Sequence, residues 1–184
     1  MQIAIVTVSD RASSGQYEDL SGPAIEAWLK EVVTSPYETV KRIIPDGVAS
    51  VRDELIALCD ERRVDLILTT GGTGPSPRDE TPEAMREVLV KELPGFGEQL
   101  RRASLEQTPT AILSRQTAGT RGKTLIINLP GKPSSIRFSL DTIFAAVPYC
   151  LDLIGAGRIE TDPARIKAFR PAPRGCLRRG RPPP

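Results

Sequence analysis

Apolar positions along the chain follow two patterns: short continuous runs typical of buried strands, and helical spacing typical of amphipathic helices. The runs predict strands over residues 3–8, 37–44, 64–70, 111–115 and 125–129. The helical spacing predicts helices over residues 21–33, 48–59, 81–91, 94–107 and 134–154, the last bent or split at Pro148. Because strands and helices alternate, we expect an α/β fold with three αβα layers and a mostly parallel central sheet.

Loops that follow predicted strands should lie together at the carboxyl edge of such a sheet. Ligands of open parallel sheets bind beyond this edge. The first of these loops is long enough for a functional role, although a plain surface loop explains its length equally well. The loops comprise residues 9–22, 45–47, 71–79 and 130–133.

The loop after the third predicted strand is the most informative. It begins with Gly71, Gly72, Thr73 and Gly74. Glycine allows close backbone approach and convergent N–H groups, which suit a phosphate. Arg78 and Asp79 then add a cation for phosphate and a carboxylate for a metal ion, so the loop predicts a nucleotide site with Mg²⁺. The alternative is an ordinary tight turn before a helix that Asp79 or Thr81 caps.

A second anion site is predicted after the last strand. Free N–H groups at a helix start attract negative charge, and Lys132 adds a cation. A plain loop with a serine cap is the alternative for this loop alone. Two glycine loops at one sheet edge favour a cleft for two phosphate-bearing substrates. The loop and helix start consist of Pro130, Gly131, Lys132, Pro133 and Ser134.

The amino-acid composition excludes several classes of function. The chain has 184 residues, a net charge of +2 and 4% aromatic residues, which argues against nucleic acid binding through basic patches and stacking platforms. It contains no histidine, which excludes Ser-His-Asp and Cys-His catalysis and the common zinc sites. Nucleotide and phosphoryl transfer needs mainly positioning and charge neutralisation, which the remaining residue types supply.

Cysteine spacing and hydropathy indicate the compartment. Cys59, Cys150 and Cys176 are far apart, as expected of reduced thiols. The N-terminus does not resemble a signal peptide, and no apolar run approaches the length of a membrane span. We therefore expect a cytoplasmic protein without membrane contact. We expect residues 1–169 to form one domain and the basic, proline-rich residues 170–184 to form a disordered tail.

Taken together, the motifs resemble a known family. Residues 69–74, 78–83, 113–115 and 127–133 are similar to the molybdopterin adenylyltransferases of molybdenum cofactor synthesis, which are related to the G domain of gephyrin. Residues 143–150 resemble the bacterial stand-alone enzymes in particular. The resemblance covers residues 1–169 and implies a fold like that of molybdopterin-binding domains.

The resemblance implies that AMP is transferred from ATP to the terminal phosphate of molybdopterin, with release of pyrophosphate. It implies Asp46 and Asp79 as catalytic carboxylates, and Asp79, beside the glycine loop, is expected to hold Mg²⁺. The implied nucleotide contacts are Gly71, Gly72, Thr73, Gly74, Ser114 and Arg115. The implied substrate contacts are Ser9, Asp10, Pro130, Gly131, Lys132, Pro133 and Ser134.

The family is trimeric, and a molybdenum insertase is a candidate partner. The apolar segment 143–154 suits a subunit contact, but it suits the chain's own core equally well. The rival functions are a binding protein that holds molybdopterin or a nucleotide without turnover, and a structural interaction module. Both aspartates are present, which favours the enzyme.

Overall fold

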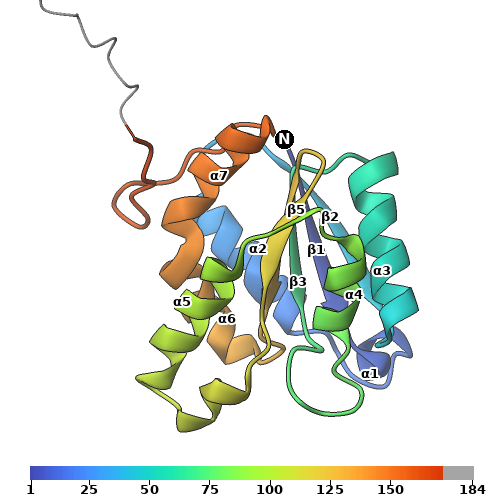
Figure 1. The fold of residues 1–184 in the computed structure, drawn as a ribbon. Coiled ribbons are helices and arrows are strands. Elements are labelled where there is room, and N and C mark those ends of the chain that lie inside the picture. Colours follow the sequence, from blue (N-terminus) through green and yellow to red (C-terminus); the bar gives the residue numbers. More distant parts are fainter. Residues whose placement is uncertain (172–184) are drawn as a thin grey trace, which may run out of the picture.

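A computed structural model describes residues 1–171, and its centre is a six-stranded sheet in the order β2-β1-β3-β6-β5-β4 (Figure 1). Strands β2, β1, β3 and β6 run parallel to one another, whereas β5 pairs antiparallel with both β6 and β4. The mostly parallel sheet predicted from the alternation is confirmed. The strands are β1 (Gln2–Val8), β2 (Glu38–Ile44), β3 (Leu66–Thr70), β4 (Lys91–Glu92), β5 (Ala118–Arg121) and β6 (Thr124–Leu129).

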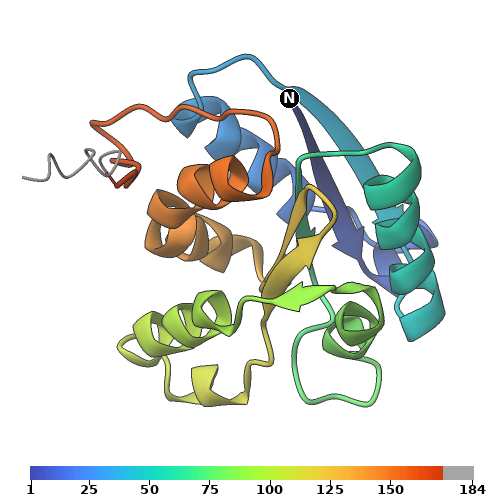
Figure 2. The same ribbon diagram turned by 45° about the horizontal axis from the view of Figure 1, so that its top comes forward.

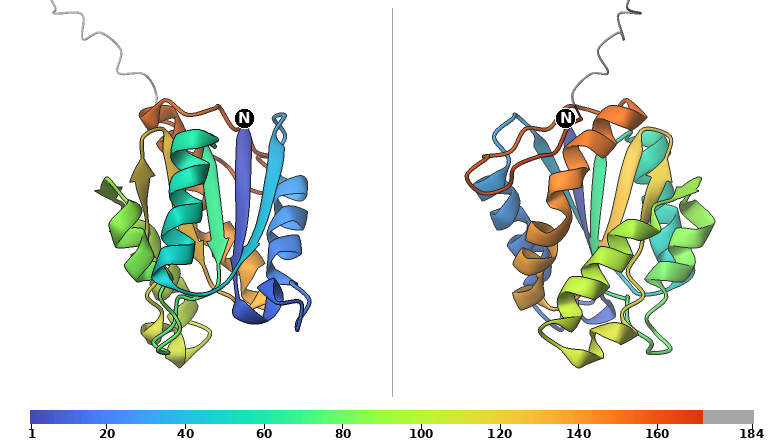
Figure 3. Two further views of the ribbon diagram at one scale, coloured as in Figure 1. Left: turned by 90° about the vertical axis from the view of Figure 1, so that its right-hand side faces the viewer. Right: turned by 60° about the vertical axis from the view of Figure 1, so that its left-hand side comes forward.

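Helices cover both faces of the sheet (Figures 2 and 3), so the predicted three layers are confirmed. Helices α2, α5, α6 and α7 pack on one face, and α3 and α4 pack on the other. The α-helices are α1 (Asp10–Ser13), α2 (Ser21–Val32), α3 (Val48–Ile56), α4 (Thr81–Val88), α5 (Pro94–Leu105), α6 (Pro133–Ile143) and α7 (Val147–Ile154). Short helical turns are η1 (Ala57–Glu61), η2 (Pro109–Leu113) and η3 (Phe144–Ala146).

The central strands are apolar because both of their faces are covered. In β1, Ile3 and Ile5 enter the core beneath α2, whereas Ala4 and Val6 enter the core beneath α3 and α4. All four are at most 2% exposed. The sheet is therefore a rigid platform whose carboxyl edge carries the loops.

Two elements differ from the sequence prediction. Residues 111–115 were predicted as a strand, but η2 occupies most of this range and Ile112 is 69% exposed. The strand β5 lies further along, where the chain turns back at Gly122 (φ 58°) and pairs with β6. Hairpin pairing decides the strand here, since β5 has little apolar content of its own.

The helix predicted over residues 81–91 ends at Val88, because the following residues form β4 and the amide of Val90 bonds Thr120 O. Tertiary pairing overrides helical spacing at this point. The helical segment 134–154 is split, as predicted: η3 separates α6 from α7, and Pro148 lies in the first turn of α7.

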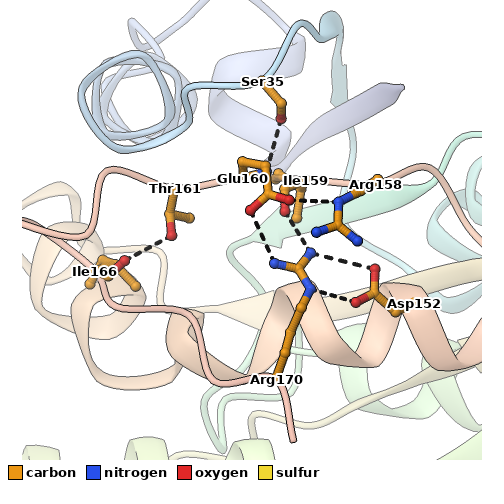
Figure 4. Close-up of polar contacts among 8 residues, drawn as sticks. All are labelled: Ser35, Asp152, Arg158, Ile159, Glu160, Thr161, Ile166 and Arg170. Atoms are coloured by element: carbon orange, nitrogen blue, oxygen red, sulfur yellow. Dashed lines mark hydrogen bonds and ion pairs between the residues drawn. The ribbon is translucent and has the colours of Figure 1, made fainter. Parts of the chain in front are cut away.

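After α7 the chain runs back across the molecule as an extended arm, residues 155–171. Arg170 near its end bonds both Asp152 of α7 and Glu160 of the arm, and its Nη2 donates to Ile159 O at 2.9 Å (Figure 4). Arg170 was assigned to the tail, and residues 172–184 of that tail lie outside the described residues. The boundary at 169 stays a prediction. No helix within residues 1–171 is long and apolar enough to cross a membrane.

Candidate active site

The loops after β1, β2, β3 and β6 gather at the end of the sheet away from the N-terminus (Figure 1). Two hydroxyl groups tie the last of these loops to the sheet and to α2. Thr70 Oγ1 donates to Pro130 O at 2.7 Å, and Ser21 Oγ donates to Gly131 O at 2.9 Å. The loops predicted from the strand order therefore form one connected surface.

A cavity of about 530 Å³ opens between these loops. We call it the carboxylate cavity because Asp19, Asp46 and Asp79 line it. Arg11 and Arg78 also line it, together with the ring of Tyr17, so charges of both signs face one space. Its walls include the predicted site residues Ser9, Asp46, Gly71, Gly72, Asp79, Gly131 and Pro133.

Asp10 and Asp46 hold each other through reciprocal hydrogen bonds. The amide of Asp10 donates to Asp46 Oδ2 at 3.0 Å, and the amide of Asp46 donates to Asp10 Oδ1 at 2.9 Å. Arg78 Nη2 bonds the Asp10 carboxylate and lies 3.6 Å from Asp46 Oδ2. The guanidinium of Arg78 thus partly neutralises both carboxylates, and its side chain is 64% exposed at the cavity.

The glycine loop needs its glycines. Gly71 and Gly72 have φ values of 105° and 62°, which side chains rarely adopt. A Cβ on Gly71 would lie 2.2 Å from Val8 O, and a Cβ on Gly131 would lie 3.2 Å from the Gly71 Cα. The two glycine loops therefore touch backbone to backbone. Thr81 is the first residue of α4 and its hydroxyl donates to Gly71 O at 3.1 Å, so it does not cap the helix as the alternative interpretation allowed.

A second cavity of about 560 Å³ lies on the other side of the two loops, and we call it the hydroxyl cavity. Serine and threonine side chains dominate its polar wall, and Leu113 and Phe138 give it apolar surface. Lys132 and Ser134 place it at the N-terminus of α6, where unpaired N–H groups favour an anion. Its predicted site residues are Thr73, Gly74, Ser114, Pro130, Lys132 and Ser134.

The structure therefore brings most predicted residues to one edge of the sheet, but it divides them between two cavities that do not coincide with the predicted nucleotide and substrate sets. Gly71 and Gly72 face the carboxylate cavity, whereas Thr73, Gly74 and Ser114 face the hydroxyl cavity. Arg115 lines neither of these cavities, because its guanidinium bonds the backbone of the glycine loop and Glu83. Residues 1–171 contain no cluster of three or more carboxylate or cysteine side chains that holds a metal ion by itself.

Asp19 is one of the cavity residues that the set of predicted site residues missed, together with Arg11 and Tyr17. Its carboxylate accepts the amides of Ser21 and Gly22 and the hydroxyl of Thr7, and it lines the carboxylate cavity. An acidic residue two positions before a Ser-Gly helix start is a capping signal that sequence analysis can find.

Known proteins are similar in sequence to this chain over most of its length. The family described as "Probable molybdopterin binding domain" matches residues 4–149. A protein of Helicobacter pylori (strain J99) named molybdopterin adenylyltransferase is 53% identical over 171 residues, covering 93% of this chain and 97% of that one. Its namesake in Escherichia coli (strain K12) is 48% identical over 183 residues, covering 93% and 94%. The chain belongs to the molybdopterin adenylyltransferase family.

The fold agrees with the family. The crystal structure of the molybdopterin biosynthesis enzyme MoaB of Thermus thermophilus superimposes with a TM-score of 0.78 at 41% identity. The match covers 85% of this chain and 98% of that one. The resemblance read from the motifs is confirmed, and so is the expected molybdopterin-binding-domain fold.

Proposed function

We propose that this chain transfers AMP from ATP to the terminal phosphate of molybdopterin and releases pyrophosphate. Curated relatives at 46–53% identity over 93% of the chain carry the name of this activity. The structural observation that carries the proposal is the pair of cavities that meet at the two glycine loops. Two phosphate-bearing substrates, one in each cavity, would bring their phosphates to the same N–H groups.

The chemistry of the cavity walls supports one ligand for each cavity. The carboxylate cavity suits ATP with its metal ion, because Asp46 and Asp79 face it and Arg78 is at hand for the departing pyrophosphate. The hydroxyl cavity suits molybdopterin, because the N-terminus of α6 and Lys132 favour a terminal phosphate while Phe138 and the hydroxyl groups suit a polar ring system.

In this arrangement an oxygen of the molybdopterin phosphate attacks the α-phosphorus of ATP, and the bond from that phosphorus to the bridging oxygen breaks. The backbone N–H groups of the glycine loop and Lys132 stabilise the charge that builds up. Asp79 and Asp46 line the same cavity and would hold Mg²⁺, which takes one or two protein carboxylates together with phosphate oxygens and water. The bound ion supplies charge neutralisation on the reacting phosphates.

An assay of the purified chain with ATP, Mg²⁺ and molybdopterin tests the proposal. We expect one pyrophosphate and one adenylylated molybdopterin per turnover, measured by coupled phosphate release and by mass spectrometry. Binding of both ligands without pyrophosphate release would favour the binding protein without turnover.

The proposal extends to assembly and cellular context. We propose a homotrimer, as in the family, located in the cytoplasm, with a molybdenum insertase as the recipient of the product. Within segment 143–154, the side chains of Phe144, Val147 and Leu151 are buried in the chain's own core. The apolar surface of this segment that a second copy could contact is the cleft of about 390 Å³ between α5 and η3. Light scattering on the eluting peak decides: the mass of one chain would refute the trimer.

A further inference from the structure

Each of the three guanidinium nitrogens of Arg115 donates a hydrogen bond to the glycine loop or to the helix that follows it. Its Nε donates to Gly74 O at 2.8 Å, its Nη2 donates to Asp79 O, and its Nη1 donates to Glu83 Oε1. Its own amide donates to Thr73 O at 2.9 Å. A single side chain thus joins the two ends of the segment 74–79, which we call the clamp loop.

Inside the clamp loop the carboxylate of Asp79 is held by backbone alone. The amide of Ser76 donates to Asp79 Oδ2 at 3.0 Å, and the amide of Asp79 donates back to Ser76 O at 2.9 Å. A Cβ on Gly74 would lie 2.8 Å from Asp79 Oδ2, so the carboxylate packs against the glycine. Its direction therefore depends on the distance between Gly74 and Asp79, which Arg115 sets.

Glu83 anchors this arginine in the first turn of α4. Burial acts to raise the pKa of Glu83, but the hydrogen bond and charge of Arg115 outweigh it and hold the pKa below its usual value. The pair is therefore charged near neutral pH. Both side chains are only about one third exposed, at 34% and 35%, so the anchor is partly shielded from water.

We propose that Arg115 is a positioning residue that aims the Asp79 carboxylate and does not bind the nucleotide. This inference rests on the proposed adenylyl transfer. The planar fork of arginine holds donors on three separate nitrogens in fixed directions, whereas lysine has all its donors on one nitrogen. Loss of the fork lets the clamp loop open, and small displacements of a reacting group lower the rate strongly.

Arg115→Ala and Arg115→Lys test the proposal, with Arg86→Ala as the matched control. Arg86 pairs with the same Glu83 at 3.3 Å, its side chain is 66% exposed, and within residues 1–171 it forms no hydrogen bond or ion pair with the clamp loop. We expect kcat to fall about 100-fold in Arg115→Ala and at least about tenfold in Arg115→Lys, with KM for ATP within about twofold. Arg86→Ala should keep wild-type values.

Two further measurements separate positioning from ligand contact. The dissociation constant for ATP in EDTA, measured by calorimetry, should stay within about twofold in all variants, because no nucleotide contact is lost. Hydrogen exchange at the amides of Ser76 and Asp79 should rise about tenfold or more in both Arg115 variants and stay unchanged in Arg86→Ala.

A tenfold or larger loss of ATP affinity in EDTA, with unchanged exchange in the clamp loop, would overturn the proposal in favour of a nucleotide ligand. Wild-type turnover in both Arg115 variants would overturn it as well. If Arg115→Ala does not fold, Arg115→Lys and Glu83→Gln carry the same comparison. A wild-type chain that binds ATP without turnover would refute the proposed function, while the exchange data would still decide whether Arg115 clamps the loop.

Discussion

Arg170 fastens the carboxyl-terminal arm to the domain, and its replacement by alanine should cost measurable stability. The side chain bonds Asp152, Glu160 and the carbonyl of Ile159, and it is 21% exposed (Figure 4). The Asp152 hydrogen bond is the main reason that the pKa of Arg170 is raised above its ordinary value. The arginine therefore stays charged throughout the pH range in which the fold is studied.

The expected loss of stability follows from how exposed the partners of Arg170 are. A hydrogen bond to a charged group contributes roughly 1.5–3 kcal/mol when buried, whereas an exposed ion pair contributes roughly 0–1 kcal/mol. Asp152 and Glu160 are 26% and 43% exposed, so solvent screens both pairs. We expect Arg170→Ala to lower the free energy of unfolding by about 1.5 kcal/mol, which for a domain of this size lowers Tm by roughly 3–6 °C.

Thermal unfolding followed by circular dichroism measures the effect, and Arg158→Ala is the matched control. Arg158 pairs with the same Glu160, but its side chain is 68% exposed, so its loss should cost less than about 0.5 kcal/mol. A chain that ends at Pro171 should have the Tm of the wild type, and a chain that ends at Phe169 should have the Tm of Arg170→Ala. Equal Tm values for Arg170→Ala and Arg158→Ala would refute the reasoning.

Three other expectations concern the site and the core. Asp79→Asn should lower turnover about 1000-fold while ATP binding survives, because asparagine still accepts the Ser76 amide but carries no charge; normal pyrophosphate release would contradict this. Gly71→Ala should lower the free energy of unfolding by about 3 kcal/mol, since its Cβ would lie 2.2 Å from Val8 O at a φ of 105°; an unchanged Tm would disprove it. Burial raises the pKa of Cys59 to about 11, so its thiol should react with a disulfide reagent at pH 8 only after unfolding; rapid labelling of the native chain would exclude this.

Much of the fold follows from local apolar pattern. The runs in β1, β3 and β6 are covered on both faces, so nothing competes with their strand character. The strand β5 could not be predicted, because its pairing with β6 comes from the hairpin and not from its own residues.

The candidate site, too, could be predicted from the sequence only in part. The glycine loops and Asp79 were predicted because backbone geometry and charge are local properties of the sequence, whereas Asp46 was named only through the family resemblance. The role of Arg115 could not be read from the sequence. Its partners Gly74, Asp79 and Glu83 are separated from it by 41, 36 and 32 positions, and only the fold brings them together.

The backbone contact between Gly71 and Gly131 has a consequence for how such a chain can diverge. In most pairs of contacting side chains, a substitution to a larger residue at one position can be compensated by a smaller residue at the other. Neither member of this pair has a side chain to give up, so a Cβ on Gly131 is accommodated only if the backbone at Gly71 shifts. Substrate preference can therefore evolve through the residues that wall each cavity more readily than through the backbone contact between the two loops.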